Sequence, residues 1–289
     1  MSAPAIARSG PGFADALRGE LALTRRRIVP WVSIAVWAFC IVVFAYLVSY
    51  LTTVGSEWYT AEQQEAAVQA MLPSGVGHYI LASLPLYAAP QFAVLGAIIG
   101  ASDYSRGTLG TIMARFPRRA PFIAARMLNL VALGLAAAFA TVVTSALASS
   151  GVALAQDARM AFPPMSELVA ALAGVWLIAV TFILIGFALG TLTRSMLAAV
   201  AIAAGWTLGV ESLAIGMLGP VVPAIEAIQG FLPVGATSSL AAGFVPEGQH
   251  SIPAVVAATS PAVAVMVLVA WIAIAGGAAA WALRGRDLA

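Results

Sequence analysis

The chain has 289 residues, of which 62% are hydrophobic and 9% charged, with a formal net charge of +2 and a mean hydropathy of +0.97. Soluble domains are about half apolar and about a quarter charged, so this composition excludes an ordinary water-soluble globule. All 14 basic residues are arginine, and without a lysine the chain cannot form the ATP-binding loop G-x-x-x-x-G-K-[ST]. Cys40 is the only cysteine, which excludes an intramolecular disulfide.

The first predicted element is a short amphipathic helix over residues 13–27. Phe13, Leu17 and Leu21 recur every four residues, while Arg18 lies on another face. The pattern predicts an interfacial helix on the inner leaflet, either as a basic anchor or as a coupling element.

Six apolar stretches follow, each long enough to cross about 30 Å of hydrocarbon as a helix of about 20 residues. The chain is therefore predicted to be an all-α integral membrane protein. The predicted spans lie near residues 29–51, 79–101, 127–149, 167–190, 196–219 and 256–283.

The arginines predict the orientation of these spans. With the N-terminus inside, 13 of the 14 arginines are cytoplasmic and only Arg159 lies outside. We therefore expect both termini to be cytoplasmic and the protein to be a multi-pass protein, such as one of a bacterial inner membrane.

Span two contains Pro85, Pro90 and Gln91, which predict a kinked and slightly polar helix. Gln91 either lines a substrate path or forms a hydrogen bond between helices. In span four, Gly186 and Gly190 form a small-xxx-small pair that allows close helix approach, including across a dimer interface.

The connection between spans two and three, residues 102–121, is predicted to form a short cytoplasmic amphipathic helix. Gly107 relaxes the backbone, Thr108 can cap the helix, Leu109 begins its apolar face and Pro117 ends it. Positive-inside topology explains part of the arginine content of this segment.

Span five carries Glu211, the only acid that lies away from the ends of a predicted span. Glu211 lies 17 residues after Arg194, which places it roughly 25 Å along the helix, near the outer interface. It is either solvated or locally hydrogen-bonded there, or it binds a cationic substrate or acts as a gate.

The next segment, residues 220–255, contains five prolines and is predicted to be a broken outer loop with a re-entrant part.

The chain resembles ABC-2 type permeases, particularly the small six-span kind found with bacitracin and lantibiotic resistance exporters. An acidic residue, Gly-Thr-Leu, Pro-x-Arg and a basic residue opening span three follow in that family's order. The matching residues are Asp103, Gly107, Thr108, Leu109, Pro117, Arg119 and Arg126. The LRGELALTRRR opening and GFALGTLTRS between spans four and five extend the resemblance. The family more often has Glu at Asp103 and Lys at Arg126.

The resemblance implies the ABC-2, type V exporter-like fold and a transport subunit that is not itself an enzyme. Two identical or homologous permeases would pair in the lipid bilayer, and a separate ABC ATPase would bind ATP and Mg, so this chain needs no cofactor and no nucleic acid. The family's function is efflux of a hydrophobic or amphiphilic solute, such as a drug, antibiotic, peptide or lipid, which often confers resistance. The residues it assigns to ATPase coupling are Asp103, Arg106, Gly107, Thr108, Leu109, Arg115, Pro117, Arg118 and Arg119. The alternatives are an ion-coupled transporter that uses Glu211 and a non-transporting membrane scaffold.

Overall fold

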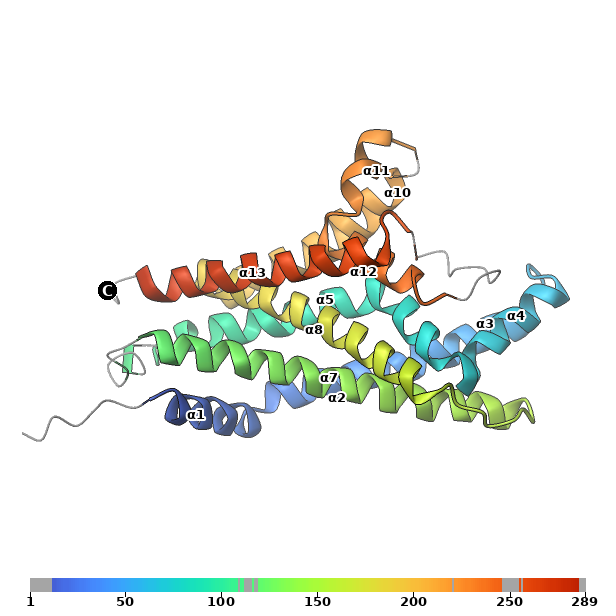
Figure 1. The fold of residues 1–289 in the computed structure, drawn as a ribbon, viewed down its shortest axis with the longest axis horizontal. Coiled ribbons are helices and arrows are strands. Elements are labelled where there is room, and N and C mark those ends of the chain that lie inside the picture. Colours follow the sequence, from blue (N-terminus) through green and yellow to red (C-terminus); the bar gives the residue numbers. More distant parts are fainter. Residues whose placement is uncertain are drawn as a thin grey trace, which may run out of the picture.

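The structure is a computed structural model that describes residues 12–108, 110–111, 116, 119–219, 221–245, 255 and 257–285. Every regular element among these residues is helical (Figure 1). Five helices of the described residues are long and apolar enough to cross a membrane, and the number is six if a bent pair counts as one span. The prediction of an all-helical multi-pass membrane protein is therefore confirmed.

The elements of the first half of the chain are α1 (Phe13–Arg26), α2 (Ile28–Cys40), η1 (Ile41–Val48), α3 (Ser49–Val54), α4 (Ala61–Met71), η2 (Pro73–Gly75), α5 (Val76–Ser105) and α7 (Arg119–Ala155). Those of the second half are α8 (Met165–Thr193), α9 (Met196–Ala204), η3 (Gly205–Ile215), α10 (Gly216–Leu218), α11 (Pro223–Gln229), α12 (Pro233–Ala242) and α13 (Pro261–Gly285).

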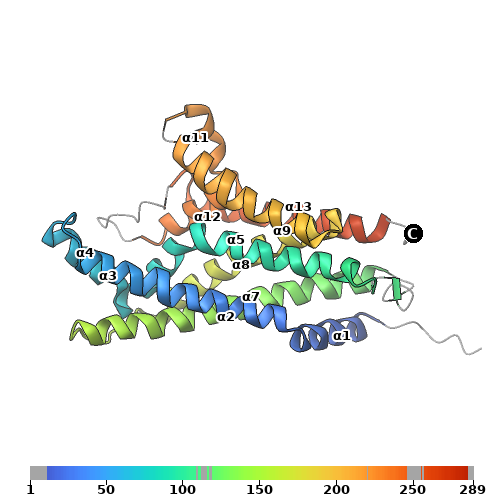
Figure 2. The same ribbon diagram turned by 180° about the vertical axis from the view of Figure 1, so that it is seen from behind.

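The long helices run side by side along the longest axis of the molecule (Figures 1 and 2). One end of this bundle, here called the arginine-rich end, carries Arg18, Arg106, Arg119, Arg194 and Arg284. It is where α1 begins, α5 meets α7, α8 meets α9, and α13 finishes (Figure 1). The opposite end is called the far end.

Helix α5 is bent, as its prolines predict. The segments Pro73–Pro85 and Tyr87–Ser105 meet at 61°. A proline inside a helix removes one backbone hydrogen bond and its ring clashes with the preceding turn. The second predicted span is therefore not one straight helix but a bent pair, which is either a broken span or a re-entrant segment.

Helices α5 and α8 approach each other through glycines. A Cβ atom on Gly186 would overlap the carbonyl oxygen of Ala93, and one on Gly96 would overlap that of Ile183. A Cβ on Gly100 or Gly190 would also come too close to the opposing backbone. The small-xxx-small pair of span four thus serves contact within the chain, where side chains would keep the two backbones apart.

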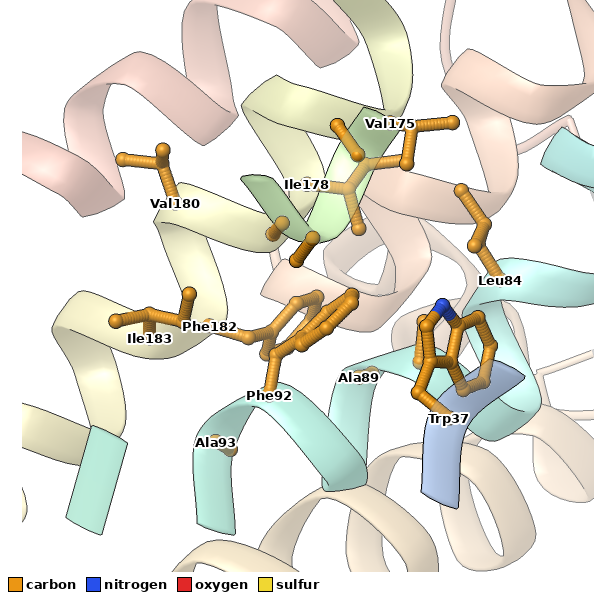
Figure 3. Close-up of a cluster of buried hydrophobic side chains, with 14 of the residues drawn as sticks. Trp37, Leu84, Ala89, Phe92, Ala93, Val175, Ile178, Val180, Phe182 and Ile183 are labelled. Atoms are coloured by element: carbon orange, nitrogen blue, oxygen red, sulfur yellow. The ribbon is translucent and has the colours of Figure 1, made fainter. Parts of the chain in front are cut away.

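Large apolar side chains fill the middle of the bundle. Figure 3 shows Phe92, Phe182 and Ile178 meeting between α5 and α8, with Trp37 of α2 beside them. The rings of Trp37 and Phe92 lie 5.5 Å apart between centroids. The indole nitrogen of Trp37 donates a 2.8 Å hydrogen bond to Thr141 Oγ1 of α7, so α2 is attached to α7 as well as to α5.

Two segments inside the predicted spans are π-helical. They are η1 in the first span and η3 in the fifth. Apolar composition predicts that such residues cross the membrane, but it does not distinguish a π-turn from an α-turn, so these segments were not predictable from hydropathy.

At the far end, α10 and α11 project away from the bundle and α12 returns to it (Figures 1 and 2). Nearly all of α12 is buried, and it packs against α5 and α13. The predicted broken loop thus contains two short helices, each of which begins with a proline. Proline favours the first position of a helix because no intrahelical partner awaits its missing N–H.

Candidate functional site

Four charged side chains meet at the arginine-rich end, and we call them the charge cluster. They are Glu20 of α1, Arg27 between α1 and α2, Asp103 near the end of α5, and Arg126 of α7. Three parts of the chain that are distant in the sequence are joined here: α1 with its junction to α2, the end of α5, and α7.

Asp103 is the centre of the cluster. Its Oδ1 accepts a 2.7 Å hydrogen bond from Arg27 Nη2, and its Oδ2 accepts one from Arg126 Nη2. Arg27 also donates to Ser102 Oγ at 3.1 Å. Arg126 Nε lies 3.8 Å from Glu20 Oε2, which completes a chain of alternating charges.

The charges of the cluster balance while water is largely excluded. The side chains of Asp103 and Arg126 are 2% and 3% exposed. The guanidinium of Arg126 also lies over the rings of Phe122 and Phe187, 5.6 and 5.5 Å from their centroids. Removing one member of such a buried set leaves an uncompensated charge, which costs much more than losing an exposed ion pair.

Helix α1 is held to the bundle by its polar stripe. Ala16 and Glu20 are its buried residues, whereas Phe13 and Leu21 are exposed. Thr24 continues the stripe and accepts a 2.8 Å hydrogen bond from Asn129 Nδ2 of α7. The apolar face is thus left free to contact lipid, in keeping with an amphipathic helix at a membrane surface.

Burial between α1 and α7 raises the pKa of the Glu20 carboxyl, and the nearby Arg126 guanidinium opposes this shift only in part. The folded protein therefore keeps this proton at pH values where the unfolded chain has released it. The tighter binding of this proton stabilises the folded protein, and the stabilisation is complete at pH values below the unfolded pKa of about 4.3. It is lost as the pH rises through the higher pKa of the folded state.

We therefore expect the melting temperature of the wild type to fall, relative to that of Glu20→Gln, as the pH increases from about 4 to 8. Thermal unfolding of both proteins in the same detergent across this range measures the difference. A difference that stays constant with pH would contradict the burial effect.

The residues after Asp103 end α5. Gly107 has φ +63°, in the left-handed region that favours glycine. Its N–H donates to the carbonyl of Tyr104, and the N–H of Thr108 donates to that of Asp103. These two bonds form a Schellman motif. The Thr108 hydroxyl also donates to Asp103 O, at 3.4 Å. The polar groups of Thr108 thus close α5. Its role as the cap of the following helix stays a prediction, because most of that segment lies outside the described residues.

The other predicted coupling residues are placed differently from one another. Arg106 is the exposed C-cap of α5. Arg119 Nη1 donates to the carbonyl oxygen of Arg284 at 2.6 Å, so it contacts the last turn of α13. Leu109, Arg115, Pro117 and Arg118 lie outside the described residues. Asp103 faces the interior, where it cannot touch a partner protein directly.

The two predicted path residues both bridge helices. Gln91 Nε2 donates to the hydroxyl and the carbonyl of Ser33 in α2, at 3.0 and 3.2 Å. Glu211 is 4% exposed and accepts hydrogen bonds from Trp206 and from the backbone of Val234. Glu211 is thus hydrogen-bonded rather than solvated. Binding of a cationic substrate or gating by Glu211 stays a prediction.

Sequence reasoning did not place Glu20, Arg27 and Arg126 in one site. A signal was present on the first helix, because Glu20, Thr24 and Arg27 repeat at helical spacing. That stripe shows that one face is polar, but it does not reveal which distant charges the face meets.

The described part of the chain holds no group of three or more His, Cys, Asp and Glu residues suited to a metal ion. In comparisons with models of protein families, with curated proteins and with solved structures, nothing matches this chain.

Proposed function

We propose that this chain is the membrane-spanning subunit of an ATP-driven exporter of the ABC-2 type. It moves a hydrophobic or amphiphilic solute out of a bacterial cell, together with a second identical or homologous permease. A separate ATPase subunit at the arginine-rich, cytoplasmic end hydrolyses ATP with Mg, because a chain without lysine cannot form the required phosphate-binding loop.

The observation that carries the proposal is the charge cluster. A permease driven by a separate ATPase needs a rigid element that passes a displacement from its surface to its membrane helices. Asp103 lies four residues before Gly107, at the inner end of the segment that resembles the family's coupling region. Through Arg27 and Arg126 this carboxylate is joined to the start of the first span and to α7.

The same end of the bundle offers cationic groups to a partner or to anionic lipid. Arg25, Arg26 and Arg106 are exposed there. The surface is thus suited to an acidic patch on an ATPase, while the cluster beneath it is shielded from the solvent.

Co-expression with a candidate ABC ATPase from the same genome, sought first beside this gene, tests the proposal. We expect the two proteins to co-purify and, in proteoliposomes, to move a lipophilic fluorescent dye only when ATP is hydrolysed. The combined variant Gly107→Ala, Thr108→Ala, Leu109→Ala should still bind the ATPase but move at least about fivefold less dye per ATP, equivalent to about 1 kcal/mol of lost coupling. Part of this effect comes from Gly107, since a Cβ is strained at its positive φ.

Gly151→Ala is the control, because nothing lies within 4 Å of a Cβ at this position of α7. Unchanged transport per ATP in the combined variant would contradict the coupling role of the segment. Rapid dye movement by this chain alone, driven by an ion gradient, would replace the proposal with the ion-coupled alternative.

A further inference from the structure

Glu211 joins two segments at the far end of the bundle. Its Oε1 accepts a 2.5 Å hydrogen bond from the indole nitrogen of Trp206, in the same π-helix η3. Its Oε2 accepts a 2.7 Å hydrogen bond from the backbone N–H of Val234, in the first turn of α12. The carboxylate therefore links span five to the buried helix of the outer loop.

The first turn of α12 needs such an acceptor. Its first residue, Pro233, has no N–H, and the N–H of Val234 follows at a position that has no partner within the helix. Val234 is buried, so water does not readily replace the missing partner. A carboxylate also interacts favourably with the positive end of the helix dipole. Glu211 thus caps α12 from another element.

The π-helix explains how Glu211 can hold both partners. Trp206 and Glu211 are five residues apart, and in an α-helix such positions diverge by about 140°. The i→i+5 bonding of a π-helix brings them toward the same side. The irregular segment η3 therefore allows Trp206 to orient the carboxylate that binds α12.

Helix α12 is packed into the bundle and nearly all of it is buried. It packs against α5, α8 and α13, and Thr237 and Ser239 at its middle have no exposed surface. Its Gly235 lies directly against the backbone of Gln229, just before the helix. A solute leaving between these helices at the far end would have to displace α12.

We propose that Glu211 is a positioning residue that keeps α12 seated against span five, and that the far end opens when the bond from Val234 to Glu211 breaks. The seating role stands on the contacts alone. The opening step rests on the proposed function, because it requires ATP hydrolysis at the other end of the bundle.

Cysteine accessibility tests the seating role without any transport. In a Cys40→Ala background, Ser238→Cys places a near-isosteric reporter in α12, where the serine is 5% exposed. The protein is held in nanodiscs and treated with a membrane-impermeant maleimide. Adding Glu211→Ala should raise the labelling rate at least about tenfold, which corresponds to about 1.4 kcal/mol in the opening equilibrium. Trp206→Phe, which keeps the bond to Val234, should raise the rate less.

Two controls distinguish a local release of α12 from a loss of packing throughout the protein. Glu226→Ala removes an exposed acid of α11 and should leave the labelling rate unchanged. A second reporter, Ser145→Cys in the buried part of α7, should stay unreactive in the Glu211→Ala protein. If Glu211→Ala left Ser238→Cys protected, or exposed both reporters equally, the seating role would be overturned.

The opening step is tested in the complex with the ATPase. ATP hydrolysis should increase labelling of Ser238→Cys when Glu211 is present, and should have little further effect in Glu211→Ala. If the complex transports dye but labelling does not respond to ATP, the opening step is wrong. If neither transport nor response occurs while Glu211→Ala still exposes α12, the proposed function fails and the seating role stands.

Discussion

Arg126→Gln is expected to lower the free energy of unfolding by about 3–5 kcal/mol, because it leaves two buried carboxylates with only Arg27 to compensate them. Arg126 is the member of the charge cluster that contacts both Asp103 and Glu20. Its side chain is 3% exposed, so solvent does not screen the charges left behind. Unfolding by titration with SDS in mixed micelles measures the loss.

Two further variants decide whether charge is the cause. Arg25→Gln removes an exposed arginine at the same end and should change stability by less than about 0.5 kcal/mol. The double variant Glu20→Gln, Arg126→Gln leaves the pair of Arg27 and Asp103 in balance, and it should recover much of the loss. A double variant less stable than Arg126→Gln would show that packing on Phe122 and Phe187, rather than charge balance, dominates.

Gly186→Ala is expected to destabilise the fold by about 1–3 kcal/mol, although alanine normally favours a helix over glycine. The added Cβ would overlap the carbonyl oxygen of Ala93, which is backbone and cannot move aside as a side chain can. Helices α5 and α8 must then separate along their whole contact. The SDS titration that is used for Arg126→Gln measures the effect.

Gly277→Ala provides the matched control on α13, since a Cβ there meets nothing within 4 Å. The same chemical change should be neutral, or stabilising by up to about 1 kcal/mol, at this position. A loss of stability in Gly186→Ala together with a gain in Gly277→Ala would establish that Gly186 is needed for the close contact of α5 and α8. Equal and small effects would show that α5 and α8 tolerate separation.

The membrane helices could be predicted from the sequence because hydrophobicity and length are local properties. The bend of α5 was likewise predictable from Pro85 and Pro90 within the helix itself. The sixth apolar helix begins at Pro261 rather than near residue 256. Helix ends depend on capping by individual residues, which average hydropathy does not resolve.

The sites were less predictable because their partners are distant along the chain. The resemblance assigns Asp103 to ATPase coupling, but it does not indicate that Asp103 pairs with Arg126, 23 residues later, inside the bundle. Local hydrogen bonding was considered for Glu211, but Trp206 is five residues away and would face elsewhere in an ordinary α-helix. Only the π-helical backbone makes that pair compatible.

The bond between Arg119 and the final turn of α13 has a consequence for how force spreads through the molecule. Arg119 is the first residue of α7. Arg126 lies two turns further along the same helix and forms an ion pair with Glu20 of α1, near the N-terminal end of the chain. A displacement of the first turns of α7 would therefore act on two membrane helices together, on α2 through α1 and on α13 through its last turn.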